Sequence, residues 1–235
     1  MGTPAACLFD LDGLLLDTEP LHARAWQQAA MQFGLALESN QLLALRGRRR
    51  LDCAEQVRQW FFAAAQTPPS VEALLAVRQP IAEALLPSAP PMAGAAVLIA
   101  ALEQRGLPMA LVTSSSAGAV ALKASGHPWL TAIKERVHGD APALAAGKPE
   151  PDPYLLAAHR LGVAAADCWA FEDSPAGARS AAAAGCRVHV LLPADASLAV
   201  TLQQHLPAGC VLLESLEQVL VDLSTDGSAQ NPAAP

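Results

Sequence analysis

The stretch "CLFDLDGLLLDTEP", residues 7 to 20, begins as an apolar run and then places three aspartates close together. Its first part, with residues 6–11 as "ACLFDL", predicts a strand that is buried on both faces. Asp10 and Asp12 come at the end of this strand, separated only by Leu11. Because two carboxylates this close repel each other unless a cation lies between them, the stretch predicts a buried strand that leads into a cation site.

Short apolar runs alternate with alanine-rich helical stretches from residue 88 onward. We expect the further buried strands at residues 109–113, 168–173, 187–192 and 210–213. We expect helices that close on a glycine at residues 94–106, 152–162 and 174–185. This alternation favours the α/β class, with a doubly wound, Rossmann-like parallel sheet.

The segment 17–87 carries helical patterns only, which lie at residues 19–34, 51–66 and 70–86. Since a predicted strand precedes it and the sheet pattern resumes after it, we interpret 17–87 as an all-helical cap domain inserted after the first strand. Residues 1–16 and 88–223 then form the α/β core domain. The small and polar residues 224–235 are predicted to be a mobile C-terminal tail.

The composition excludes several classes of function. A formal net charge of −7 argues against nucleic acid as a partner. The five cysteines are scattered without a C-x-x-C pair, which suits the reducing cytoplasm, and no signal-peptide pattern or membrane-spanning run is visible. We therefore expect a cytoplasmic protein that is a monomer by default and binds neither nucleic acid nor membrane.

Polar side chains stand at the ends of the other predicted strands. Thr113 ends one strand and is followed by Ser114, while Glu172 and Asp173 end another. Lys148 stands in a Gly-Lys-Pro loop. Because ligands collect at the carboxyl ends of parallel strands, we expect these residues to lie close to the two aspartates of the first strand.

This set of residue types suits phosphoryl transfer. Asp10, Asp173 and Glu172 can share Mg²⁺, a hard cation that prefers oxygen ligands. Thr113 and the backbone N–H groups after it can hold phosphate oxygens, and the lysine of the Gly-Lys-Pro loop can neutralise both a carboxylate and the phosphate. An aspartate at such a site can attack phosphorus and form an acyl phosphate, while Asp12 protonates the leaving oxygen and then deprotonates the attacking water.

Four segments, "FDLDGLLLDT", "LVTSS", "GKPEPDPY" and "FEDSPAG", resemble the four ordered motifs of the haloacid dehalogenase superfamily of phosphotransferases. The predicted helical insertion falls where that superfamily carries a helical cap. The resemblance implies that Asp10 is the nucleophile and that Asp12 is the general acid/base, which also offers its backbone carbonyl to Mg²⁺. It implies that Asp173 is a metal ligand, with Glu172 in support. The residues implied to bind the phosphoryl group are Thr113, Ser114 and Lys148, and Lys148 is also implied to be catalytic.

The opening of the predicted cap, "DTEPLHARAW", resembles β-phosphoglucomutase and the sugar-phosphate phosphatases close to it. In the mutase, residues matching Thr18 and His22 lie at the hinge and help to manage the general acid/base. Arg50 matches a cap arginine that grips the distal phosphate of a bisphosphorylated intermediate, and Arg78 matches another cationic cap position. The resemblance therefore implies that His22 and Arg50 bind substrate.

The same residues argue against two other chemistries of this superfamily. True dehalogenases lack an aspartate at the position of Asp12, and phosphonate-cleaving relatives need a cap lysine, whereas Lys123, Lys134 and Lys148 all lie outside the predicted cap. We favour a Mg²⁺-dependent phosphatase that acts on a small phosphorylated metabolite, a sugar phosphate in particular. A β-phosphoglucomutase-like mutase is the alternative, followed by a non-catalytic binding protein on the same scaffold.

Other polar and aromatic residues are interpreted as structural. Ser115 and Ser116 are expected to cap the helix that follows them. Trp26 and Trp60 are expected in the core of the cap. The histidines after His22 show no metal-ligand spacing.

Overall fold

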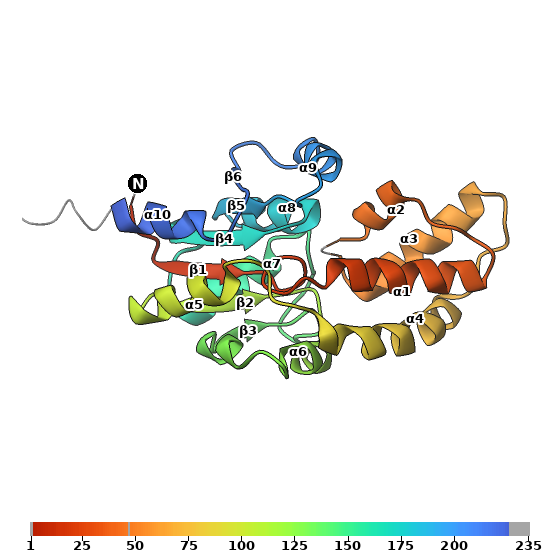
Figure 1. Cartoon of the computed structure of the whole chain (residues 1–235), viewed down its shortest axis with the longest axis horizontal. Coiled ribbons are helices and arrows are strands. Elements are labelled where there is room, and N and C mark those ends of the chain that lie inside the picture. The colour runs from red at the N-terminus through yellow and green to blue at the C-terminus, as the bar shows by residue number, and fades with distance from the viewer. Residues whose placement is uncertain (1, 47, 226–235) are drawn as a thin grey trace, which may run out of the picture.

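Among residues 2–46 and 48–225, which the structure describes, the computed structural model has six strands in one sheet. The strands are β1 (Ala6–Phe9), β2 (Met109–Val112), β3 (Glu135–Val137), β4 (Cys168–Glu172), β5 (Arg187–Leu191) and β6 (Val211–Leu213). Their order across the sheet is β3-β2-β1-β4-β5-β6, and every neighbouring pair is parallel. The doubly wound parallel sheet is therefore confirmed (Figure 1).

Helices cover both faces of the sheet. They are α5 (Ala95–Gln104), α6 (Ala117–Ala124), α7 (Asp152–Leu161), α8 (Pro175–Ala183), α9 (Ala196–Gln203) and α10 (Gln218–Thr225). One apolar cluster joins the sheet to α5, α6 and α10, and a second joins it to α7, α8 and α9. Three short 3₁₀ segments complete the core at Leu86–Ser88, Pro128–Ala132 and Ala165–Asp167.

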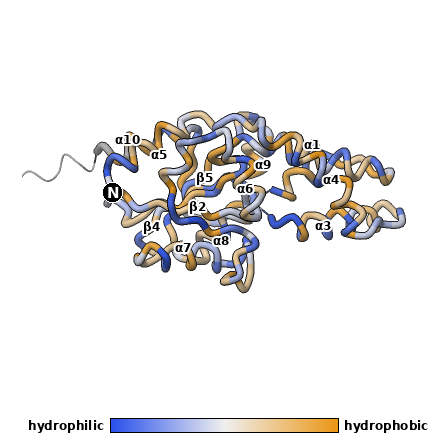
Figure 2. Tube along the Cα trace, turned by 90° about the horizontal axis from the view of Figure 1, so that it is seen from below, coloured by the Kyte–Doolittle hydropathy of each residue, from blue (hydrophilic) through white to orange (hydrophobic). Residues whose placement is uncertain are grey.

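The chain between β1 and α5 forms a separate group of helices beside the carboxyl ends of the strands (Figure 1). This cap consists of α1 (Glu19–Gln32), α2 (Ser39–Ala44), α3 (Arg50–Ala63) and α4 (Val71–Leu85). Its own apolar core contains the buried side chains of Trp26, Val57, Phe61 and Leu74. Apolar and polar positions alternate along α1 and α4, as amphipathic helices around such a core require (Figure 2).

The structure differs from the sequence predictions at one edge of the sheet and at the last helix. Strand β3 was not expected, because it is three residues long and two of them, Glu135 and Arg136, are charged and half-buried at the sheet edge. Helix α10 continues to Thr225, so the first two residues of the tail predicted at 224–235 are helical. The rest of that tail, 226–235, lies outside the described residues.

The five cysteines are free thiols. Within the described part of the chain, no helix combines the length and the apolar character needed to cross a membrane.

The topology brings three loops to one place. From β1 the chain adds β2 and β3 on one side and then crosses to add β4, β5 and β6 on the other. The carboxyl ends of β1, β2 and β4 therefore meet where the direction of winding reverses, which is where open α/β sheets bind ligands. Phe9 and Phe171 stack with ring centroids 4.7 Å apart and fix the ends of β1 and β4 against each other.

Candidate active site

A cluster of three buried carboxylates lies at the ends of β1 and β4. Asp10, Glu172 and Asp173 each offer an oxygen, and these oxygens lie within 4.8 Å of one another. Neither carboxylate oxygen of Asp173 has a hydrogen-bond partner among the described residues, although both are buried. A buried carboxylate without a partner is unfavourable, and a hard divalent cation would satisfy it. The cluster therefore fits a metal ion such as Mg²⁺.

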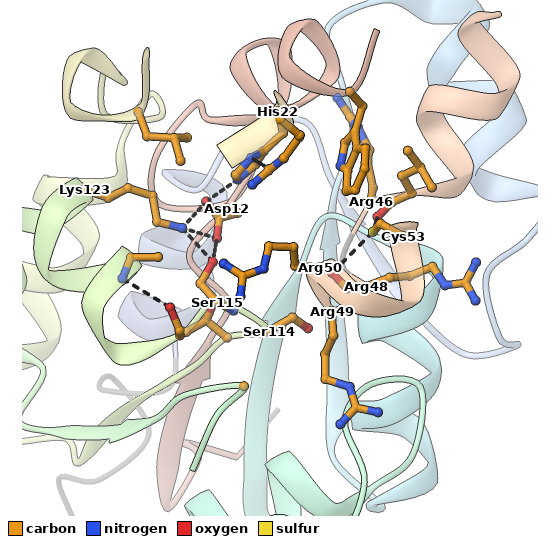
Figure 3. A pocket seen from close by; sticks show the side chains of 18 of the residues that line it. Asp12, His22, Arg46, Arg48, Arg49, Arg50, Cys53, Ser114, Ser115 and Lys123 are labelled. Atoms are coloured by element: carbon orange, nitrogen blue, oxygen red, sulfur yellow. Dashed lines mark hydrogen bonds and ion pairs between the residues drawn. The ribbon is translucent and has the colours of Figure 1, made fainter. Parts of the chain in front are cut away.

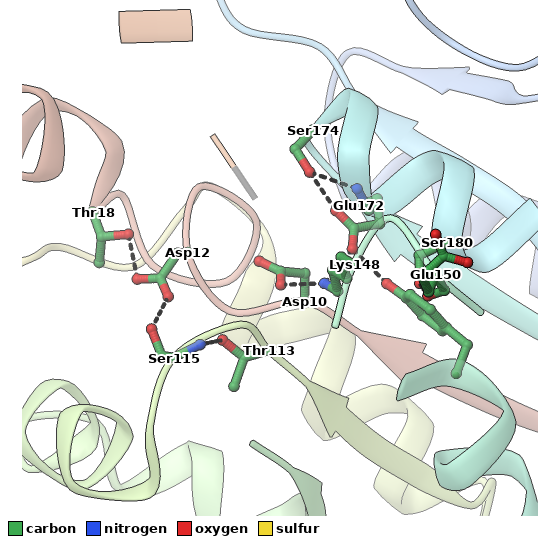
Figure 4. A network of polar contacts seen from close by, with 12 residues as sticks. Asp10, Asp12, Thr18, Thr113, Ser115, Lys148, Glu150, Glu172, Ser174 and Ser180 are labelled. Atoms are coloured by element: carbon green, nitrogen blue, oxygen red, sulfur yellow. Dashed lines mark hydrogen bonds and ion pairs between the residues drawn. The ribbon is translucent and has the colours of Figure 1, made fainter. Parts of the chain in front are cut away.

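Lys148 lies between two of these carboxylates (Figure 4). Its Nζ donates to Oδ1 of Asp10 over 2.6 Å and also contacts Oε1 of Glu172. Burial alone would lower the pKa of Lys148, but the ion pairs with Asp10 and Glu172 raise it, so the ammonium stays charged. Glu172 also accepts from Tyr154 at Oε1 and from Ser174 at Oε2. Both of its oxygens are thus already engaged by the protein.

Two carboxyls of this cluster, those of Asp10 and Asp173, ionise with difficulty in the absence of a cation. Burial raises the pKa of Asp10 to about 7, with Lys148 opposing the shift and Glu172 adding to it. Burial also raises the pKa of Asp173 well above its usual range, and the neighbouring Glu19 adds to the effect. Because negative charge is unfavourable here without a positive partner, the electrostatics agree with a cation site.

Glu19, at the start of α1, is a fourth carboxylate beside this cluster. Gly13 turns the chain with a φ of +84°, and a Cβ there would overlap Oδ2 of Asp173 and lie 2.7 Å from Cγ of Glu19. Glu19 is buried and pairs with Arg46 of the cap at 3.1 Å. Glu19 is not among the site residues predicted from the sequence. Its position in "DTEP", directly after the predicted hinge, was the available signal.

Asp12 faces a different set of groups, all of which are donors (Figures 3 and 4). Thr18 Oγ1 lies 2.6 Å from Oδ1, Ser115 Oγ lies 2.9 Å from Oδ2, and His22 Nε2 lies 3.2 Å from Oδ1. The ammonium of Lys123 is 2.6 Å from both oxygens. Burial alone would raise the pKa of Asp12, but Lys123 and His22 hold it well below its usual range.

A cap residue fixes the hydrogen positions on His22. Arg78 Nη2, from α4, lies 2.7 Å from Nδ1 of His22. A guanidinium can only donate, so Nδ1 accepts and the hydrogen of the neutral ring is on Nε2, which donates to Asp12. Burial lowers the pKa of His22 and Arg78 adds to this, which keeps the ring neutral despite Asp12. Arg78 itself packs over the ring of Trp26 at 5.1 Å.

A cavity of about 870 Å³ separates this end of the core from the cap. Asp10, Asp12, Thr113 and Ser114 are among its core-side residues. Thr113 is buried, and its hydroxyl accepts from the backbone N–H of Ser115 over 3.1 Å. The cap side is strongly cationic and includes Arg46, Arg48, Arg49 and Arg50 (Figure 3). Arg78 lines the cavity as well.

The predicted site residues thus come together in two groups. Asp10, Lys148, Glu172 and Asp173 form one, and Asp12 with Thr18 and His22 forms the other. Arg50 lies at the cavity, but its Nη1 donates to Oε1 of Gln79 over 3.0 Å, within the cap.

Two residues on the core side of Asp12 were interpreted wrongly or missed. Ser115 was expected to be a helix cap, whereas its hydroxyl contacts Asp12 and only Ser116 caps α6, accepting from Ala119 N. Lys123 is not among the site residues predicted from the sequence, yet it is fully buried against Asp12. The available signal was its position three residues after Val120, which puts it on the buried face of α6.

Comparison with known proteins identifies the family of this chain. Residues 4–185 match the family model of haloacid dehalogenase-like hydrolases. The chain belongs to this family. This haloacid dehalogenase-like hydrolase is 34% identical over 221 residues to hexitol phosphatase A of Escherichia coli (strain K12), covering 94% of this chain and 95% of that protein. It is 34% identical over 194 residues to a protein of Drosophila melanogaster named "Probable pseudouridine-5'-phosphatase", covering 80% of each.

A solved structure shows the same fold. β-Phosphoglucomutase from Clostridium difficile superposes with a TM-score of 0.78 at 16% identity, covering 95% of this chain and 96% of that one. The predicted superfamily, the α/β core and the helical cap are therefore confirmed, and the named curated relatives are phosphatases of small phosphorylated metabolites.

Proposed function

We propose that this chain is a Mg²⁺-dependent phosphatase that hydrolyses a small phosphorylated metabolite, and a sugar phosphate in particular, through a phosphorylated aspartate. The observation that carries the proposal is the contrast between two neighbouring carboxylates. Asp10 lies in a metal-type cluster with Lys148, and Asp12, two residues away, is surrounded by separate donors. Pairs of carboxylates in such different environments are typical of a nucleophile and an acid/base working side by side.

The residues that would hold the metal ion are Asp10, Asp173 and the backbone carbonyl of Asp12, with Glu172 in support. The oxygens of Asp173, which have no partner in the described structure, support this assignment, and the engaged oxygens of Glu172 support its lesser role. When bound, Mg²⁺ supplies positive charge that offsets the carboxylates and the phosphoryl oxygens.

In the proposed reaction, Asp10 attacks phosphorus. An Oδ–P bond forms, the bond from phosphorus to the leaving oxygen breaks, and Asp12 gives its proton to that oxygen. Thr113, Ser114 and Lys148 hold the phosphoryl oxygens. Water then attacks the same phosphorus, Asp12 takes its proton, and the Oδ–P bond breaks to release phosphate and restore Asp10. Asp12 therefore works in both protonation states, and the structure shows the donors that stabilise its carboxylate form.

The cap is proposed to comprise residues 17–87 and to select the substrate. The cap side of the cavity carries Arg48, Arg49 and Arg50, whose guanidinium groups suit an anionic or hydroxyl-rich substrate. His22, proposed from the sequence to bind substrate, is assigned instead to the orientation of Asp12, because its Nε2–H points at that carboxylate. The free thiols support a proposed location in the cytoplasm.

A sugar-phosphate mutase is the second candidate. The cationic cap side of the cavity favours it, because a mutase has to hold a bisphosphorylated intermediate. The two candidates differ in their product, which is inorganic phosphate for the phosphatase and an isomeric sugar phosphate for the mutase.

The experiment that tests the proposal incubates the purified protein with Mg²⁺ and a panel of substrates, and follows free phosphate and sugar isomers together. The panel contains hexitol 6-phosphates, hexose phosphates, β-glucose 1-phosphate and pseudouridine 5′-phosphate. We expect phosphate release that EDTA abolishes, because the carboxylate cluster then lacks its cation.

The Asp173→Asn variant should lose this activity, and Asp167→Asn, which changes an exposed aspartate outside the site, should keep it. Isomerisation with little phosphate released would favour the mutase. Phosphate release that is indifferent to EDTA and to Asp173→Asn would contradict the metal site.

A further inference from the structure

Lys123 is a fully buried lysine that reaches the site from the core side. It lies on α6, and its Nζ is 2.6 Å from each carboxylate oxygen of Asp12 and 2.8 Å from Oγ of Ser115. Ser115 in turn donates to Oδ2 of Asp12 over 2.9 Å. Lysine, serine and aspartate form a closed triangle of contacts (Figure 3).

The burial of this ammonium needs a reason. A buried ammonium loses its hydration and ordering the long side chain costs rotamer entropy, so an apolar residue would pack under α6 at lower cost. Among the described residues, Asp12 is the acidic group that Lys123 contacts. Nζ is equidistant from the two oxygens, so the contact fixes the plane of the carboxylate as well as its position.

Asp12 is therefore held from two sides. Thr18 and His22 contact it from the hinge and from the first cap helix, while Ser115 and Lys123 contact it from the core. The hinge-side contacts depend on the placement of the cap, because Arg78 of α4 orients His22. The core-side contacts come from the loop after β2 and from α6, and they involve no cap residue.

We propose that Lys123, together with Ser115, is a positioning residue that aims the carboxylate of Asp12 at the leaving oxygen independently of the cap. This inference rests on the proposed phosphatase function. Its consequence is selective: the loss of Lys123 impairs the step in which Asp12 transfers a proton and spares the attack of Asp10 on phosphorus.

Two aryl phosphates separate these effects. Nitrophenolate is a weak base and leaves without a proton, whereas phenolate benefits from one. The ratio kcat/KM reports the steps up to formation of the phosphorylated aspartate. For Lys123→Met we expect kcat/KM to fall by roughly 10- to 100-fold with phenyl phosphate, but by less than about threefold with p-nitrophenyl phosphate. A merely structural role would lower both alike.

The matched control is Lys134→Met, which changes an exposed lysine and should leave both values unchanged. In an Asp12→Asn background, Lys123→Met should cause no further loss with phenyl phosphate, because the group that it positions no longer transfers a proton. Ser115→Ala removes a half-buried hydroxyl and should cause a smaller loss with the same selectivity for phenyl phosphate. It carries the test if Lys123→Met fails to fold.

The outcomes distinguish the inference from the proposed function. Wild-type protein that hydrolyses neither these esters nor any substrate of the panel would overturn both. The inference alone would be overturned if the wild-type protein is active and Lys123→Met lowers the activity on both esters equally, or on neither. If Lys123→Met is unfolded, the same criterion applies to Ser115→Ala. A further loss from Lys123→Met in the Asp12→Asn background would overturn it as well.

Discussion

The Asp10→Asn variant is expected to lose turnover by roughly 10⁴-fold or more while remaining folded. An amide of the same shape fills the same space but is too weak a nucleophile to attack phosphorus. The substitution is not expected to unfold the protein. Burial raises the pKa of Asp10 to about 7, so its ionised form destabilises the metal-free fold as the pH rises through that value, and asparagine removes this charge.

The measurement compares turnover and thermal unfolding of Asp10→Asn with those of wild type and of the control Asp167→Asn. The control should match wild type in both. If Asp10→Asn kept its activity within tenfold of wild type, Asp10 would not be the nucleophile. If it lost activity only because it unfolded, the thermal transition would show this.

Lys148→Met is expected to reduce both activity and stability. Its ammonium lies between Asp10 and Glu172, and its removal leaves two buried carboxyls without their shared partner. Breaking such a buried pair costs about 3 kcal/mol of unfolding free energy, and losing a cation that holds the phosphoryl group costs roughly 10²- to 10³-fold in turnover.

The stability loss should depend on pH in a defined direction. Without Lys148 the pKa of Asp10 rises further, so Asp10 is protonated at pH 5 and ionised at a cost at pH 8. The loss should therefore be larger at pH 8, which denaturant unfolding of the metal-free protein can measure at the two pH values. The control is Lys134→Met, at an exposed lysine. A Lys148→Met protein as stable and as active as this control would contradict the assigned role.

The metal-type cluster could be predicted because it follows from local rules. Asp10 comes directly after the apolar run of β1, Glu172 and Asp173 follow the apolar run of β4, and the carboxyl ends of parallel strands converge. Strand β1 and the helices with serine caps were predictable for the same reason. Ser174 accepts from Gly177 N, and Ser70 accepts from Ala73 N at the start of α4.

The surroundings of Asp12 could not be predicted in this way. Lys123 meets Asp12 across 111 positions in the chain, and Arg78 meets His22 across 56. These contacts depend on how α6 and the cap pack onto the ends of the strands, and neither hydrophobic periodicity nor strand-end position specifies that packing. Strand β3 was missed because a short, half-buried edge strand lacks a continuous apolar run.

The central claim is a transient phosphoryl group on Asp10, and rapid quenching followed by mass spectrometry tests it directly. Protein mixed with Mg²⁺ and an active substrate is quenched in acid within the first turnover, digested, and searched for a phosphorylated peptide. The account predicts one phosphoryl group on Asp10, absent from Asp10→Asn and accumulating in Asp12→Asn, which breaks down the intermediate slowly. A phosphoryl group on another residue, or none while phosphate is being released, would contradict it.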